Sequence, residues 1–153
     1  MSVQIAKHLR AVYFGGNWTS VNLKETVTDV SWLQATKKIQ SFNTIAALVY
    51  HINYYVSTIV KVLQSAPLDA HDKYSFDLPS ISSQQDWEEL LHNSFSEAEK
   101  LADLIEHFPD DRLSEIFVNE KYGNYYRNFW GVIEHTHYHL GQIVLIKKLL
   151  LEN

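Results

Sequence analysis

Apolar residues recur at helical spacing over four long stretches of the chain, and polar residues occupy the positions between them. The pattern predicts long helices at about 2–14, 43–65, 84–107 and 124–151. Only five glycines and three prolines interrupt the sequence, which favours long helices. Within residues 18–42 the apolar groups are short, and the cap-like residues Ser20, Thr28 and Ser31 predict one or two short helices.

The ends of these helices carry recognisable signals. Ser2 is expected to cap the first helix, and Gly15-Gly16-Asn17 to end it. Pro109 marks the end of the third long helix.

The connections between the long helices differ greatly in length. The segment 67–83 has two prolines and no helical period, and it is long for a compact domain. Such a connection can cross the end of a helix bundle and start the next helix parallel to the last. A second connection spans 110–121. Four long helices with unequal loops predict an all-α four-helix bundle, and 153 residues fit a single domain, 1–153.

Composition narrows the possible chemistry. The net charge is −5, and no Lys/Arg cluster exceeds two residues, so a nucleic-acid partner is not expected. Cysteine is absent, which excludes disulfides, thiolate ligands and a cysteine nucleophile, and leaves histidine and carboxylate for any transition metal. Lys7, His8 and Arg10 interrupt any signal-peptide core, and no apolar run approaches the ~20 residues of a membrane span. A cytoplasmic protein with no membrane partner is therefore expected.

The helical faces separate the eight histidines into two groups. His92, His107 and His137 fall on polar faces, His71 lies in the long connection, and the position of His8 is ambiguous. Three histidines share the apolar faces. His51 projects from the middle of the second long helix's apolar arc, and His135 and His139, four residues apart, project from one face of the last helix.

Inward histidines at this spacing suit a divalent metal ion. Two histidines at i and i+4 can chelate one ion, and a third from a facing helix completes a three-ligand set. Neutral imidazoles with open positions suit Zn or Ni first, with Fe or Mn as alternatives. The competing interpretation is that His51, His135 and His139 are buried, hydrogen-bonded core residues that bind no metal.

Two segments resemble the metal-bearing helices of the DinB-like (DinB/YfiT-like) superfamily. They are NTIAALVYHINYY, residues 43–55, and GVIEHTHYHLGQI, residues 131–143, which contains the YH-x-GQ stretch found in that family. KHLRAVYFGGNW near the N-terminus and KYSFD before the third long helix are similar to one bacterial branch of it.

The resemblance implies an up-down-down-up four-helix bundle, frequent homodimers, and a divalent metal ion on His51, His135 and His139. Characterised relatives include transferases that attach low-molecular-weight thiols to electrophiles, and an isomerase that uses such a thiol. A thiol cofactor is therefore an expectation. Gln142 is either a partner that steadies one imidazole or a surface residue, and the extra histidine His137 is expected to lie outside the ligand set.

Three functional hypotheses follow. The first is a divalent-metal-dependent enzyme, a thiol transferase or a hydrolase, in which the ion activates a thiol or water. The second is a non-catalytic, metal-stabilised binding or stress-response module, and the third is a helical dimer without metal. Tyr54, Tyr55, Tyr138 and Trp130 are candidates to line a pocket. No catalytic side chain is assigned, because Glu134, the acidic residue beside the histidines, faces the charged side of its helix.

Overall fold

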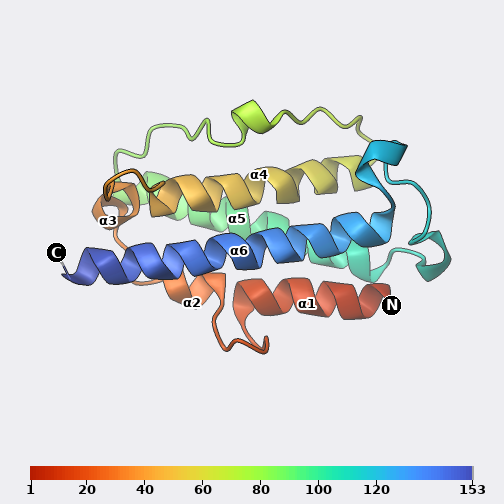
Figure 1. Cartoon of the computed structure of the whole chain (residues 1–153), viewed down its shortest axis with the longest axis horizontal. Helices are drawn as coiled ribbons and strands as arrows, with labels where there is room; N and C mark the ends of the chain where they lie inside the picture. The colour runs from red at the N-terminus through yellow and green to blue at the C-terminus, as the bar shows by residue number, and fades with distance from the viewer. Residues whose placement is uncertain (153) are drawn as a thin grey trace.

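The computed structural model describes residues 1–152 and contains six α-helices, four of them long (Figure 1). The α-helices are α1 (Ser2–Phe14), α2 (Leu23–Val27), α3 (Trp32–Thr36), α4 (Ile45–Leu63), α5 (Gln84–Glu106) and α6 (Tyr125–Glu152). Three short 3₁₀ turns, η1 (Asp72–Tyr74), η2 (Asp110–Arg112) and η3 (Glu120–Tyr122), lie in the connections. The positions predicted for the four long helices, and for two short ones within 18–42, are confirmed.

Side-chain caps explain where the long helices begin. Thr44 Oγ1 accepts a hydrogen bond from the backbone N–H of Ala47 at 3.1 Å, at the start of α4. Ser83 Oγ does the same for Asp86 at 3.1 Å, at the start of α5. These bonds satisfy N–H groups that have no partner inside the helix.

The prediction that Ser2 caps the first helix is wrong. Met1 occupies the cap position and makes no side-chain cap, and Ser2 is already helical and buried. Because Ser2 lies against the rest of the protein, its hydroxyl does not reach the free N–H groups of α1.

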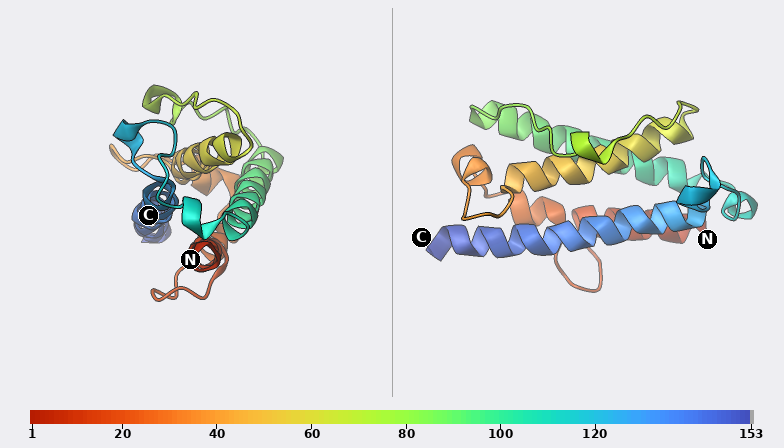
Figure 2. Two further views of the ribbon diagram at one scale, coloured as in Figure 1. Left: turned by 90° about the vertical axis from the view of Figure 1, so that its right-hand side faces the viewer. Right: turned by 45° about the horizontal axis from the view of Figure 1, so that its top comes forward.

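The four long helices pack side by side around a common core. α1 contacts α5 and α6, and α4 contacts α5 and α6. α4 and α5 run in one direction, whereas α1 and α6 run in the other (Figures 1 and 2). α4 and α6 are therefore antiparallel neighbours, which places the middle of one helix beside the middle of the other.

The long connection after α4 runs back along that helix rather than only across its end (Figures 1 and 2). Two successive parallel helices require this course, since the chain must return from the end of α4 to the level where α4 began. For 19 residues that distance is about 28 Å. The return carries η1 over the middle of α4.

α4 is long and apolar enough to satisfy the length and hydropathy test for a membrane span, with a mean hydropathy of 1.2 over its best window. The expectation that no apolar run approaches this length was therefore too strict. Half of that window is buried inside the protein, against α3, α5 and α6. A core helix explains the composition, because its apolar face is covered by other helices.

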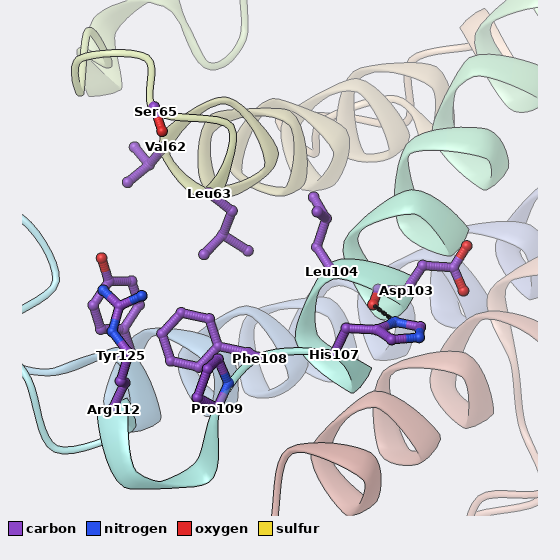
Figure 3. A pocket seen from close by; sticks show the side chains of 10 residues that line it. All are labelled: Val62, Leu63, Ser65, Asp103, Leu104, His107, Phe108, Pro109, Arg112 and Tyr125. Carbon is purple, nitrogen blue, oxygen red and sulfur yellow. Dashed lines mark hydrogen bonds between the residues drawn. The ribbon is translucent and has the colours of Figure 1, made fainter.

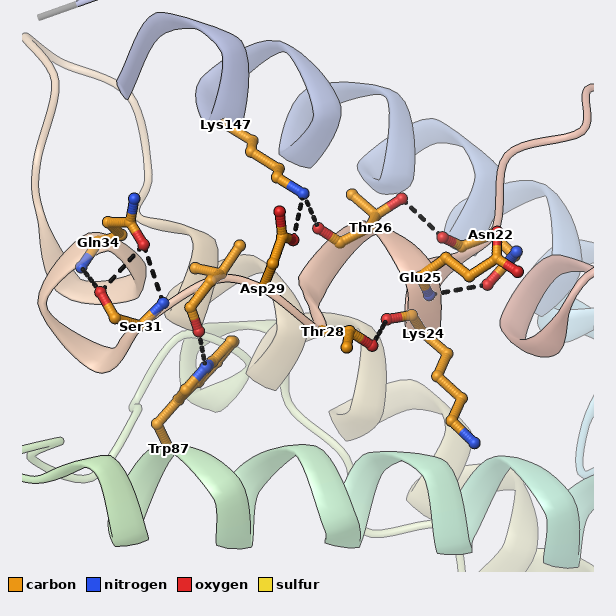
Figure 4. Close-up of polar contacts among 11 residues, drawn as sticks. Asn22, Lys24, Glu25, Thr26, Thr28, Asp29, Ser31, Gln34, Trp87 and Lys147 are labelled. Atoms are coloured by element: carbon orange, nitrogen blue, oxygen red, sulfur yellow. Dashed lines mark hydrogen bonds and ion pairs between the residues drawn. The ribbon is translucent and has the colours of Figure 1, made fainter. Parts of the chain in front are cut away.

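Polar contacts attach the segment that carries α2 and α3 to the long helices (Figure 4). Lys147 of α6 donates to the backbone carbonyl of Thr26 at 2.8 Å and pairs with Asp29 at 2.5 Å. The buried Trp87 of α5 donates its indole N–H to the carbonyl of Val30 at 2.8 Å. The segment thereby links α5 to α6.

A cluster of charges joins α1 to α5. The guanidinium of Arg10 contacts Glu99 at 2.6 Å, Glu106 at 2.8 Å and Asp103 at 2.5 Å. The hydrogen bond and charge of Glu99, followed by those of Glu106, raise the pKa of Arg10 further above its usual value. Without the guanidinium, three carboxylates on one face of α5 would repel one another.

We predict that Arg10→Met lowers the free energy of unfolding by about 1–2 kcal/mol, as expected for several partly exposed ion pairs lost together. Urea denaturation measures the effect. Arg112→Met is the matched control, because Arg112 forms one exposed ion pair, with nearby Glu115, among the described side chains and otherwise lies over the Phe108 ring, and it should change stability by less than about 0.5 kcal/mol. Equal effects of the two substitutions would show that the Arg10 cluster does not hold α1 on α5.

Candidate metal centre

Three histidines from two helices converge at the middle of the protein. His51 comes from α4, and His135 and His139 come from α6. The Nε2 atom of His135 lies 3.1 Å from Nε2 of His51 and 3.1 Å from Nε2 of His139. His51 and His139 are buried and His135 is half-buried. The structure thus brings together the three histidines that the helical faces selected.

A hydrogen-bond chain fixes the protonation of His51. Ser75 donates its hydroxyl hydrogen to the backbone carbonyl of Asp72 at 2.7 Å, and its Oγ lies 3.0 Å from Nδ1 of His51. Since the hydroxyl has one hydrogen and has already used it, Ser75 Oγ must accept from the Nδ1–H of His51. In the neutral ring, Nε2 of His51 therefore carries a lone pair.

His139 has the same tautomer for a similar reason. Its Nδ1 lies 2.7 Å from Oε1 of Gln142, one turn later on α6. An amide oxygen only accepts, so Nδ1 of His139 donates and Nε2 keeps its lone pair. Of the two interpretations of Gln142, the structure supports the partner that steadies an imidazole.

The Nε2 atoms of the triad cannot satisfy one another. The lone pairs of His51 and His139 both face Nε2 of His135, which has at most one hydrogen to donate. At least one lone pair in the cluster is then left without a donor. A divalent cation accepts all three at once, and the donor set therefore fits a metal ion better than a hydrogen-bonded core cluster.

The surroundings of His51 and His135 favour the neutral form of these two rings, the form that binds metal. Burial, followed by the nearby His139, lowers the pKa of His51 below its usual value. Burial, His139 and His51 together lower the pKa of His135 to about 4. Neutral rings at pH 7 offer lone pairs without first losing a proton.

Aromatic rings enclose the triad on the side of α4 and its return connection. Phe76 stacks on His51 with ring centroids 3.9 Å apart and planes 10° apart. Tyr55 packs in a T-shaped arrangement against both His51 and His135, with ring centroids 5.2 Å and 4.8 Å apart, respectively. The Tyr55 hydroxyl donates to Asp72 at 2.9 Å, which ties α4 to η1 beside the cluster.

Ser75 and Phe76 were missed as site residues from the sequence. Both lie in the KYSFD run, 73–77, which was noted for its resemblance to one bacterial branch but given no role. Local pattern could not place them, because 24 residues separate Ser75 from His51. The one signal that could have pointed to Ser75 and Phe76 was the family-like KYSFD run, which lies in a connection that otherwise has no recognisable pattern.

The remaining candidates lie elsewhere. His92, His107 and His71 are exposed, and half-buried His137 is not among the converging rings. Glu134 is exposed, as its helical face predicted.

Of the aromatic candidates for pocket lining, Tyr55 borders two cavities. Tyr138 is 66% exposed with its ring against His139, and Tyr54 bonds His71 in the connection. Trp130 packs against His8.

A cavity of about 330 Å³ opens beside the triad at its half-buried member, His135. Its lining comprises Tyr55, Ile59, Lys121, Tyr122, Arg127, Asn128, Gly131, Val132 and His135. A ligand in this cavity would lie beside His135, one of the three converging imidazoles.

Another hollow of about 500 Å³, between the end of α4 and the end of α5, shares no lining residue with the triad (Figure 3). Two of its polar side chains already have partners: His107 Nδ1 lies 2.8 Å from the backbone carbonyl of Asp103, and Arg112 pairs with Glu115.

The fold and the triad together define an all-helical protein with a histidine cluster suited to a metal ion. A sequence model of the DinB superfamily matches residues 16–143, and the chain belongs to that superfamily. No curated protein and no solved structure matched the chain in the corresponding comparisons.

We predict that the metal-free protein holds His51 and His139 as Nδ1–H tautomers at neutral pH, because Ser75 and Gln142 each accept from Nδ1. Long-range ¹H–¹⁵N NMR spectra of the imidazoles report the tautomer directly. Ser75→Ala should shift His51 toward a tautomer mixture and leave His139 unchanged. Gln142→Ala should shift His139 toward a mixture and leave His51 unchanged. Nε2–H tautomers in the unaltered protein would contradict the assignment.

Proposed function

We propose that this protein is a divalent-metal-dependent enzyme whose ion is held by His51, His135 and His139. The observation that carries the proposal is the convergence of three imidazole Nε2 atoms, two of which are fixed as lone-pair donors. Membership of the DinB superfamily supports it.

The donor set favours an enzyme over a closed, purely structural metal site. Among residues 1–151, whose side chains the structure describes, the converging group contains three histidines and no fourth histidine or carboxylate. Structural zinc sites usually have four protein ligands, whereas catalytic sites keep a position open. The cavity that His135 lines supplies space for a ligand beside the triad.

The protein's own groups orient the ligands and restrict solvent. Ser75 and Gln142 hold two imidazoles by their outer nitrogens, and Phe76 covers one face of His51. When bound, a divalent ion on three neutral ligands retains its double charge and lowers the pKa of a bound water or thiol. We propose Zn or Ni as the ion, and transfer of a low-molecular-weight thiol or hydrolysis as the reaction.

The arrangement of the chain and its assembly are companion proposals. We propose that the protein is a single domain with the family's up-down-down-up four-helix bundle, supported by the parallel course of α4 and α5. We also propose a cytoplasmic homodimer. The exposed Phe42 and Leu145 beside an apolar hollow of about 210 Å³ support a paired surface.

We predict that the protein, purified after growth or refolding with Zn²⁺ or Ni²⁺, retains about one ion per chain, because three donors converge on one point. Elemental analysis with circular dichroism as a folding check measures this. His51→Ala, His135→Ala and His139→Ala should each lose the ion.

His92→Ala is the matched control, because His92 is exposed on α5, and it should retain the ion. An unaltered, folded protein that keeps no stoichiometric metal would refute the proposed function.

A further inference from the structure

The cavity beside His135 is bordered by positive charge at its outer end. Lys121 lies in η3, and Arg127 lies in the first turn of α6. Both are exposed, and in the described part of the chain neither lies within ion-pair distance of a carboxylate. The ammonium of Lys121 lies over the Tyr122 ring, 4.6 Å from its centroid, and neither cation is neutralised by a carboxylate, although the protein's net charge is −5.

Arg127 differs from the other arginines of the chain. Arg10 and Arg112 are each paired with carboxylates, whereas Arg127 is not. Its side chain is held against the preceding loop, where Gly123 has φ +75° and an added Cβ would lie 2.9 Å from Cδ of Arg127. An unpaired guanidinium at a cavity presents the paired donors that bind a carboxylate or phosphate.

The floor of the cavity is apolar and aromatic up to the triad. Ile59, Tyr122 and Val132 line it, and Val132 lies between Arg127 and His135 along α6. Asn128 donates to the backbone carbonyl of Tyr122 at 3.0 Å, which holds η3 against α6. The cavity is therefore charged near the start of α6, partly apolar along its lining, and bordered by His135 about two turns further along α6.

A glycine keeps this space open. Gly131 lies in the interior of α6, where glycine costs roughly 0.5–1 kcal/mol relative to alanine. A Cβ added there would meet nothing within 4 Å, so no packing requires its absence. Gly131 also lines the cavity one turn before His135, and a larger side chain would occupy it.

We propose that this cavity binds a small organic anion, with its carboxylate or phosphate at Lys121 and Arg127 and its apolar body directed toward His135. The proposal rests on the proposed function for what happens at the triad, and it specifies the substrate class: an anion with an apolar or aromatic part.

The test compares two probes of matched shape, phenylacetate and the neutral phenylacetamide, titrated calorimetrically into Zn²⁺-loaded protein. Phenylacetate should bind at least about tenfold more tightly, as expected for a charge-assisted contact. Phenylphosphonate, titrated in parallel, distinguishes phosphate-type from carboxylate-type ligands by which of the two anions binds more tightly. Equal binding of phenylacetate and phenylacetamide would overturn the proposal.

Variants locate the site. Lys121→Gln combined with Arg127→Gln should abolish the preference for the anion, and Gly131→Leu should abolish binding of both probes, while metal content stays unchanged. Lys148→Gln, which removes an exposed cation elsewhere on α6, should change neither the preference for the anion nor the binding of the two probes. Anion binding that survives both the double substitution and Gly131→Leu would overturn the proposal.

The same measurements separate this proposal from the metal site. Repeating the titration with metal-free protein should still show the preference for phenylacetate, because Lys121 and Arg127 do not bind the ion. Full metal content without anion preference would overturn the anion site alone. Anion preference in a protein that never retains metal would leave the anion site and overturn the proposed function.

Discussion

The site depends on one constraint: three imidazoles share a point at which their lone pairs cannot satisfy one another. Ser75 and Gln142 hold the outer nitrogens of His51 and His139, and this directs both Nε2 lone pairs at His135. A hydrogen-bonded core cluster would need donors that these rings do not have. A shared cation resolves the conflict, and burial that lowers the pKa of His51 and His135 favours it further.

The course of the chain supplies the parts of this site that are distant in sequence. Because α4 and α5 run parallel, their connection must return along α4, and it contacts His51 on the way. That return delivers Ser75 and Phe76 to one imidazole. The antiparallel course of α4 and α6 delivers the other two, and the second connection places Lys121 beside the cavity. The order and direction of the helices therefore determine which distant residues form the site.

Helical periodicity was sufficient for the long helices and for the choice of three histidines among eight, because both depend on which face of a helix a residue occupies. It failed where the answer depends on tertiary contacts. Ser2 carries a good cap side chain but is buried inside α1. Ser75 lies in a segment without periodicity, and only the folded chain shows that it orients His51. The cavity combines residues from α4, η3 and α6, which no local pattern relates.

The most direct test is X-ray absorption spectroscopy at the metal edge of the protein loaded with Zn²⁺ or Ni²⁺. Three imidazoles converging on one ion predict a shell of nitrogen scatterers at about 2.0–2.1 Å, with the outer-ring scattering of three histidines. The same spectrum of His135→Ala should show the outer-ring scattering of two histidines. A spectrum of the unaltered protein fitted by fewer than three imidazoles, or by a shell composed mainly of carboxylate oxygens, would contradict the account.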